Sequence, residues 1–116
     1  VMANFKDGRI FDGNHPGTGR CIGNIKDHRF FEGSGFPGSG KCIGNTKDGR
    51  IFEGSGFPGS GKCIGNVKDG YVYSGSGFPG SGKRIGKVSE FTVKGMERER
   101  DDDIVAAYHF LVKKFL

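Results

Sequence analysis

The stretch KCIGNTKDGRIFEGSGFPGSG, residues 41–61, is followed directly by KCIGNVKDGYVYSGSGFPGSG, residues 62–82. The two segments are nearly identical, and they define a repeat period of 21 residues. The same unit continues in diverged form, upstream from Cys21 and downstream from Arg84, so that the array spans about residues 2–95. A single unit of this size cannot bury an apolar face alone, so neighbouring units must face one another. The sequence therefore predicts a tandem-repeat fold.

Two kinds of turn separate the apolar runs of each unit. The first is a tight Asp-Gly pair, in which His28 replaces Gly in one unit. Asp-Gly between apolar runs predicts a type I′ hairpin turn, because both central residues need positive φ, and that φ strains His28. The second is a Gly-rich loop around Phe-Pro, which is one residue shorter and lacks Phe in the first unit. The tight pairs begin at Asp7, Asp27, Asp48 and Asp69, and the Phe-Pro loops lie at 33–40, 54–61 and 75–82.

The runs between these turns have the length of strands and are too short for helices. We therefore expect an all-β meander of about ten short strands, with four β-hairpins around a pseudo-fourfold axis. Hairpins closed by the long loop are expected at 9–25, 29–46, 50–67 and 71–88, inside a repeat domain of residues 1–95. Because strand side chains alternate, both faces of the sheet should be partly covered. The side chains expected to fill the centre are Ile22, Ile43, Ile64, Ile85, Phe11, Phe31, Phe52 and Tyr73.

Residues 96–116 differ from the repeats and are predicted to form a linker and a C-terminal amphipathic α-helix. Asp102 or Asp103 is a good N-cap, and apolar residues follow at helical spacing as far as Leu116. The helix is apolar over much of its circumference, so it either packs within its own chain or joins two chains. We expect the second arrangement, a homo-oligomer. The predicted interface residues are Ile104, Tyr108, Leu111, Val112 and Phe115.

Composition narrows the class of protein. The 116 residues include 23 Gly and 11 Phe, but Gly does not occur at every third position, and the regular spacing of Phe argues against disorder. No apolar stretch approaches the roughly 20 residues of a membrane span, and residues 1–4 do not read as a signal peptide. Three Cys residues without a secretion signal indicate reduced thiols. We therefore expect a cytoplasmic protein that does not bind membranes.

Several motifs suggest chemistry that their context does not support. The spacing G-x-x-x-x-G-K occurs from Gly35 to Lys41 and in two later copies, but a P-loop needs Ser or Thr next and a helix, and Cys42 follows here in a strand. Cys21, Cys42 and Cys63 are equivalent, yet their wide spacing favours packing over a metal site. Asp101–Asp103 is best explained as a helix cap. No nucleophile and base are paired in the sequence, so no enzyme, cofactor or metal is predicted.

Two sets of equivalent residues are candidates for ligand binding. The repeat domain carries a net charge of +6, which either solvates the protein or attracts polyanions. Four cations at one position of the repeat would form a rim. A Phe at each long-loop tip either folds back over the neighbouring hairpin or stacks on bases or sugars. The rim residues are Arg20, Lys41, Lys62 and Lys83, and the loop-tip residues are Phe36, Phe57 and Phe78.

These observations predict a non-enzymatic binding or interaction module that self-associates through its C-terminal helix. The alternative function is a polyanion or single-stranded nucleic-acid binder that uses the Lys/Arg rim and the Phe-Pro loops.

An aromatic strand such as Arg50-Ile51-Phe52, a Gly-rich loop, and a Gly-centred strand such as Ile64-Gly65-Asn66 alternate along the array. This pattern resembles the four-fold β-flower domain, found in small, mostly bacterial proteins with four tandem hairpins. It is also similar to orphan proteins of mobile (integron) gene cassettes. The resemblance covers the repeats and implies a fold without catalytic residues. The longer, Gly-rich loops and the C-terminal helix depart from the family pattern.

Overall fold

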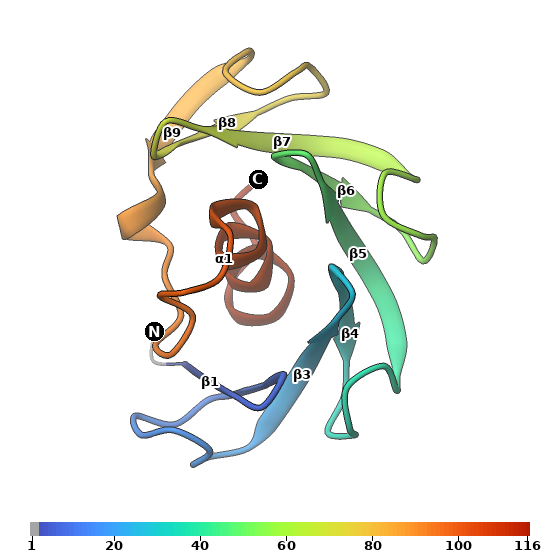
Figure 1. Cartoon of the computed structure of the whole chain (residues 1–116), viewed down its shortest axis with the longest axis vertical. Coiled ribbons are helices and arrows are strands. Elements are labelled where there is room, and N and C mark those ends of the chain that lie inside the picture. The colour runs from blue at the N-terminus through green and yellow to red at the C-terminus, as the bar shows by residue number, and fades with distance from the viewer. Residues whose placement is uncertain (1–2) are drawn as a thin grey trace.

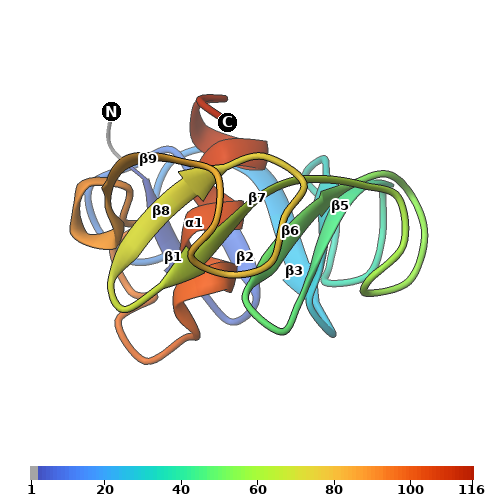
Figure 2. The same cartoon turned by 90° about the horizontal axis from the view of Figure 1, so that it is seen from above.

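The computed structural model describes residues 3–116, in which nine strands form one antiparallel sheet in sequence order. The sheet curves around the C-terminal helix α1, as Figures 1 and 2 show from two directions. The repeats therefore form a curved sheet, and the C-terminal segment, residues 96–116, contributes the helix that the sheet surrounds. The strands are β1 (Asn4–Lys6), β2 (Arg9–Phe11), β3 (Cys21–Lys26), β4 (Arg29–Glu32), β5 (Lys41–Lys47), β6 (Arg50–Glu53), β7 (Lys62–Lys68), β8 (Tyr71–Ser74) and β9 (Lys83–Lys87).

The tight turns have the predicted backbone. Asp48 and Gly49 have φ of 50° and 82°, and the other two Asp-Gly pairs are alike. At the variant turn, Asp27 and His28 have φ of 52° and 63°. His28 therefore holds a left-handed conformation that costs a non-Gly residue free energy. The positive φ expected at both central residues is confirmed in all four turns.

The long loops join β2 to β3, β4 to β5, β6 to β7 and β8 to β9, and each of these pairs is antiparallel with one register shift. The sheet is open, with β1 and β9 at its edges. Beyond β9 the chain crosses the gap, where Lys94 pairs in parallel with Asn4 and its carbonyl accepts the Phe5 N–H at 2.7 Å. The all-β sheet with one C-terminal helix is confirmed, with nine strands among the described residues instead of about ten. The pseudo-fourfold axis stays a prediction.

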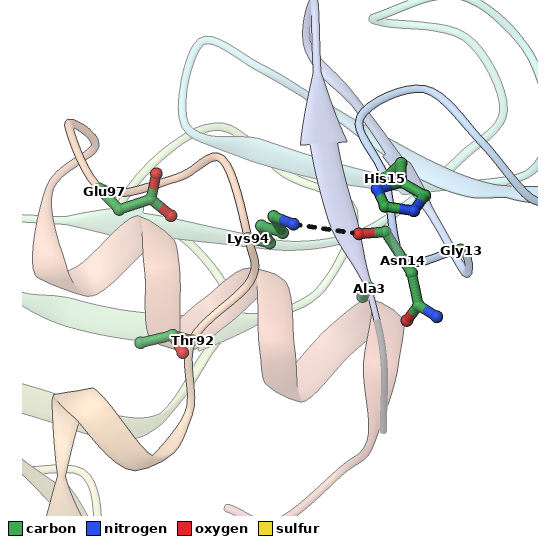
Figure 3. A pocket seen from close by; sticks show the side chains of 7 residues that line it. All are labelled: Ala3, Gly13, Asn14, His15, Thr92, Lys94 and Glu97. Atoms are coloured by element: carbon green, nitrogen blue, oxygen red, sulfur yellow. Dashed lines mark hydrogen bonds between the residues drawn. The ribbon is translucent and has the colours of Figure 1, made fainter.

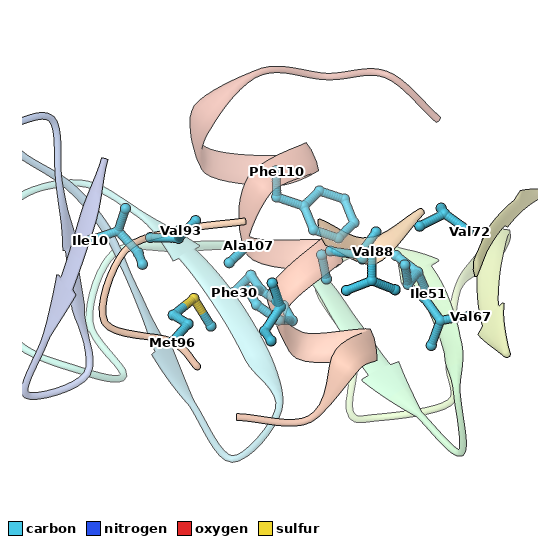
Figure 4. Close-up of a cluster of buried hydrophobic side chains, with 13 residues drawn as sticks. Ile10, Phe30, Ile51, Val67, Val72, Val88, Val93, Met96, Ala107 and Phe110 are labelled. Carbon is cyan, nitrogen blue, oxygen red and sulfur yellow. The ribbon is translucent and has the colours of Figure 1, made fainter. Parts of the chain in front are cut away.

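The core lies between the inner face of the sheet and α1 (Figure 4). The predicted residues Ile22, Ile43, Ile64 and Ile85 do pack against it, although they are only partly buried. The prediction was wrong for the aromatic positions, because side chains alternate and the residue before each of them faces inward. The core cluster contains Ile10, Phe30, Ile51 and Val72, and it does not include Phe11, Phe31, Phe52 or Tyr73.

Each Gly of the Ile-Gly pairs leaves room for one large side chain from the C-terminal part of the chain. A Cβ on Gly44 would collide with the ring of Phe110, and one on Gly23 or Gly65 would lie 2.5 or 2.8 Å from a leucine methyl. Gly86 has slightly more room, with 3.0 Å to the ring of Phe91. The missing side chains let the helix segment approach the sheet backbone closely. The pairs are Gly23 with Leu111, Gly44 with Phe110, Gly65 with Leu116, and Gly86 with Phe91.

The C-terminal helix is shorter than predicted. Helix α1 covers Asp101–Ala107, and a π-helical turn over Tyr108–Val112 ends it, with the Lys113 N–H donating to the Tyr108 carbonyl at 2.8 Å. The last four residues are not helical. The N-cap is Arg100, so the prediction of Asp102 or Asp103 at that position was wrong. A separate 3-10 turn, Val88–Glu90, follows β9.

The predicted oligomer-interface residues pack within their own chain. Ile104 is buried, Leu111 lies on Gly23, and Phe115 stacks on Phe91 with ring centroids 4.1 Å apart. Tyr108 meets Phe91 edge-on, and Val112 packs against the same core. The apolar stripe on which the oligomer prediction rested is therefore used largely within the chain, although Tyr108, Leu111, Val112 and Phe115 stay partly exposed, and the homo-oligomer stays a prediction. Among residues 3–116, no helix has the length and apolar character needed to cross a membrane.

Candidate binding surface

The outer face of the sheet is covered by the long loops, and a buried asparagine holds each loop in place. The Asn45 Nδ2 donates to the Ser60 carbonyl at 3.1 Å, and its Oδ1 accepts the Gly59 N–H at 2.8 Å. The equivalent Asn4, Asn24 and Asn66 make the same two kinds of bond, and all four are 0% exposed. These asparagines fix the position of the loops relative to the strands.

The loop-tip phenylalanines lie in the open. Phe36, Phe57 and Phe78 are 76–78% exposed, and these three are the exposed large hydrophobic residues of the described chain. One side of each ring is nevertheless in contact, because a guanidinium carbon from the preceding unit lies 5.0–5.5 Å from its centroid. The arginines are Arg9 over Phe36, Arg29 over Phe57, and Arg50 over Phe78.

Each of these arginines joins two repeat units. The Arg50 guanidinium also lies 5.3 Å from the ring of Phe52 on its own strand, and its Nη2 donates to the Ser76 carbonyl at 2.8 Å. Arg9 and Arg29 make equivalent contacts. The Nε atom of all three arginines is buried and has no partner within residues 3–116. Each guanidinium thus contacts two aromatic rings and is held by a hydrogen bond to a loop carbonyl.

The expectation that the loop tips fold back holds in part, and stacking on bases or sugars stays a prediction. The tip does fold back, since Pro37 contacts Gly8 and Pro79 lies beside Gly49, each in the tight turn of the preceding repeat unit. The Phe ring beside that proline still turns most of its surface to solvent. One face of each ring therefore contacts an arginine and the other faces solvent, so the free face is suited to stacking.

A groove opens between the Phe-Pro loops 54–61 and 75–82. This cavity, of about 460 Å³, lies between Pro58 of one loop and Phe78-Pro79 of the next, and Lys47, Asp48 and Arg50 line it. A smaller cavity in the first unit, of about 230 Å³, is lined by the equivalent Lys6, Asp7 and Arg9. The lysine is positioned by its own loop, because a Cβ on Gly59 would touch the Lys47 Cδ. Each groove therefore combines two cations, one carboxylate and aromatic surface.

The predicted Lys/Arg rim has a different environment. Arg20 Nε is 3.8 Å from Asp12 Oδ2, and the Arg20 N–H donates to Oδ1 of the same carboxylate at 2.6 Å. Lys41 and Lys62 stand opposite Glu32 and Glu53 in the strand register, while Lys83 stands opposite Ser74. All four rim cations are exposed, but three face a carboxylate. The cations over the loop-tip rings are Arg9, Arg29 and Arg50.

A larger groove, of about 600 Å³, lies where the open edge of the sheet meets the segment after β9 (Figure 3). The Lys94 Nζ donates to the Asn14 carbonyl at 3.3 Å across it. His15 stands before Pro16, in the place that Phe holds in the other three loops. Thr92 and Glu97 complete the polar lining. This groove therefore carries no arginine-backed phenyl ring.

A buried polar cluster connects α1 to the sheet. Asp103 accepts the Thr46 hydroxyl at 2.6 Å, and its other oxygen is 2.8 Å from His28 Nδ1. Asp102 pairs with Arg100 at 2.8 Å and accepts the Gly49 N–H. These carboxylates, which the sequence suggested were helix caps, instead tie the helix to two hairpin turns. The sequence does not reveal this pairing because the partners are far apart in the chain.

His109 lies in the π-helical turn, where it is 2% exposed. Its Nδ1 accepts the N–H groups of Phe115 and Leu116 at 3.0 and 3.1 Å. Burial lowers the pKa of His109 to about 4, and the charge of Lys114 acts in the same direction. The neutral imidazole therefore holds the end of the chain.

The cysteines do not meet. Cys21, Cys42 and Cys63 lie on separate strands, all are free, and each thiol is 3.6–3.7 Å from the carbonyl of the Gly two residues later. In the described part of the chain, no group of three or more His, Cys, Asp or Glu residues is arranged to hold a metal ion.

Comparison with known protein families, with curated proteins and with solved structures found no match to this chain. The resemblance to the four-fold β-flower domain therefore stays a prediction from the repeat pattern alone.

Proposed function

We propose that the protein is a non-enzymatic binding module whose binding surface is the loop-covered outer face of the sheet. One observation carries this proposal: three equivalent phenylalanines are exposed by 76–78% on loops that buried asparagines and stacked arginines hold in place. Large apolar rings in water favour association with a partner. Because the loops are already ordered, little conformational entropy is lost when a partner binds.

A second candidate function is binding of polyanions, single-stranded nucleic acid among them. A specific observation favours it, namely that each exposed ring is backed by an arginine and stands beside a lysine-containing groove. Aromatic rings interleaved with cations are typical of proteins that bind single strands. The proposal does not use the C-terminal helix, whose apolar residues lie in the core.

The equivalent contacts of successive units also support a finer description of the fold. We propose that the four hairpins follow a pseudo-fourfold axis, with the Lys94 segment closing the gap beside β1. The free thiols support a reducing, cytoplasmic location.

The binding proposal is tested by changing Phe36, Phe57 and Phe78 together to Ser. If the rings serve binding, the triple variant keeps the fold and loses little stability, about 0.5–1 kcal/mol for each ring–arginine contact. Urea unfolding followed by circular dichroism measures this. As a matched control, changing the core residue Phe30 to Ser should be far more destabilising. A triple variant that unfolds as readily as the Phe30 variant would show that the rings are structural.

The second candidate is tested by fluorescence anisotropy with a labelled 12-nucleotide thymidine strand at low and moderate salt. Binding that weakens steeply as salt rises is expected, because Lys and Arg contacts displace counterions. No binding at low salt, to either this strand or heparin, would exclude the polyanion function and leave the aromatic surface for a partner of another class.

A further inference from the structure

We propose that single-stranded nucleic acid binds in the grooves between successive Phe-Pro loops, with a base on the free face of each loop-tip ring and phosphates at the lysine and arginine of the groove. This inference rests on the second candidate function above. The cations proposed to bind phosphate differ from those expected from the sequence. They are the Lys and Arg of the Lys-Asp-x-Arg turns, and not the rim residues Arg20, Lys41, Lys62 and Lys83.

The groove between the loops 54–61 and 75–82 shows how such a site is assembled. Phe78 and Pro79 form one side, Pro58 and Gly59 the other, and Lys47 and Arg50 contribute positive charge between them. The ring and the cations of one groove come from two neighbouring repeats, so the site exists only where repeats adjoin. The chain contains three such sets: Lys6, Arg9 and Phe36; Lys26, Arg29 and Phe57; and Lys47, Arg50 and Phe78.

The charges favour the groove over the rim. Three of the four rim cations stand opposite or beside a carboxylate, which cancels much of their attraction for an anion. Within residues 3–116, Arg20 is the one cation of the two sets with a carboxylate within ion-pair distance. The difference lies in the balance of charge, because each groove sets a lysine and an arginine against one aspartate, whereas Lys41 and Lys62 each stand opposite one glutamate. An anionic backbone therefore gains more from Lys47 and Arg50 than from Lys62 and its neighbour Glu53.

The aromatic geometry favours bases as the partner of the rings. Phe78 offers one free face, while the other face is occupied by the Arg50 guanidinium at 5.3 Å from the ring centroid. A phenyl ring has no hydrogen-bonding group, so stacking on it accepts any base and reads no sequence. A neutral sugar could accept hydrogen bonds from the groove cations but would gain no charge–charge attraction from them. The combination of a free ring and cations matches a strand that alternates bases and phosphates.

The groove between the open edge of the sheet and the segment after β9 marks the end of this surface. His15 replaces the loop-tip Phe there, and Lys94, with a bond to the Asn14 carbonyl, stands where the other loops meet an arginine. The proposal therefore assigns three stacking positions, not four.

The position of the phosphates is tested with two triple variants that remove the same charge. The groove variant is K6Q/K26Q/K47Q, and the rim variant is K41Q/K62Q/K83Q. Affinity for the labelled thymidine 12-mer is measured by anisotropy at one low salt concentration. The groove variant should bind about tenfold or more weakly than the unchanged protein, whereas the rim variant should lose no more than about threefold. Circular dichroism and thermal unfolding show whether both variants are folded, and the single change K47Q serves if the groove triple is not.

The role of the rings is tested with a 12-mer of the same charge that lacks bases. The unchanged protein should prefer the thymidine strand over the abasic strand by at least about tenfold, and F36A/F57A/F78A should bind the two alike.

Equal affinity of the unchanged protein for both strands would overturn base stacking and leave a plain polyanion surface. A rim variant that loses as much as the groove variant, or more, would overturn the assignment of the cations while nucleic-acid binding itself stands. If neither strand binds at low salt, the candidate function and this inference fail together.

Discussion

At the scale of single residues, the asparagine of each Ile-Gly-Asn motif has a role that its position in a strand does not suggest. Asn45 is 0% exposed and satisfies one N–H and one carbonyl of the loop 54–61. An amide offers a donor and an acceptor on two separate atoms, so Asn45 can donate to the Ser60 carbonyl through Nδ2 and accept the Gly59 N–H through Oδ1. The signal in the sequence was the recurrence of Asn at one place in every unit.

Changing Asn45 to Ala should leave two loop groups unsatisfied and destabilise the protein by about 1–3 kcal/mol. Asn45→Asp should also be destabilising, because a carboxylate cannot donate to Ser60. Urea unfolding measures the loss, and hydrogen exchange should show faster exchange confined to the loop 54–61. An unchanged midpoint for both variants would contradict the assigned role.

His109 is the second residue whose chemistry follows from its place in the fold. The folded protein keeps its pKa near 4, against 6.5 when exposed, so the unfolded chain binds a proton first as the pH falls. The contribution of His109 to the free energy of unfolding is therefore fully present above pH 6.5. It falls progressively between pH 6.5 and 4, and the total loss is on the order of 3 kcal/mol.

The check is the free energy of unfolding of the unchanged protein and of His109→Asn, measured from pH 4 to 7.5. Asn keeps an acceptor for the Phe115 and Leu116 N–H groups but does not titrate in this range. The difference between the two curves cancels the other titrating groups and should show the predicted slope. Parallel curves would contradict it.

At the scale of elements, the close approach of the helix segment to the sheet depends on the glycines of the Ile-Gly-Asn strands. Phe110 lies directly on Gly44, and the π-helical turn carries Leu111 to Gly23. Beyond the turn, Leu116 reaches Gly65 and Phe115 stacks on Phe91. A regular helix to residue 116 would carry these side chains away from the sheet, which explains why the helix ends early.

A methyl group on Gly44 should therefore displace the Phe110 ring. We expect Gly44→Ala to cost about 1–3 kcal/mol through overpacking. In the double variant Gly44→Ala/Phe110→Leu, the smaller side chain should relieve part of that cost, so that the two changes are not additive. Thermal unfolding of the four proteins of the cycle gives the coupling. Strict additivity would show that the two residues do not meet as described.

At the scale of the whole molecule, nine short strands enclose the C-terminal segment of the same chain (Figure 1). Many large side chains of the Gly-rich repeats lie outside the core cluster, so the helix segment supplies much of the core. Asp102 and Asp103 add polar ties from α1 to the turns at Gly49 and His28. Removing the helix segment should therefore affect folding more than assembly.

Leu111→Asp distinguishes these two roles. With Leu111 packed on Gly23, the change should lower the free energy of unfolding by several kcal/mol at every protein concentration. Light scattering during size exclusion and unfolding at two concentrations provide the measurement. If the unchanged protein is an oligomer and Leu111→Asp is a stable, folded monomer, Leu111 instead lies at an interface between chains.

The repeat, its period, the two turn types and the C-terminal amphipathic segment could be predicted because each depends on residues close in sequence. The type I′ φ values at Asp48 and Gly49 follow from two adjacent residues, and strand length follows from turn spacing. The candidate site was predicted in part, since Phe36, Phe57 and Phe78 proved exposed, whereas their arginine partners come from the preceding unit.

Local sequence thus determined the strands, their turns and the loop-tip rings. The tertiary structure alone decided which face of the strands became the core, where the helix ended and which cations stand beside the rings. The physical reason is that the core face, the end of the helix and the position of the cations all depend on packing between segments that are distant in sequence. Phe110 packs on Gly44 across the core, and Asp103 binds Thr46 and His28, which are more than fifty residues away in the chain. Side-chain periodicity shows that a face is apolar, but not what will cover it.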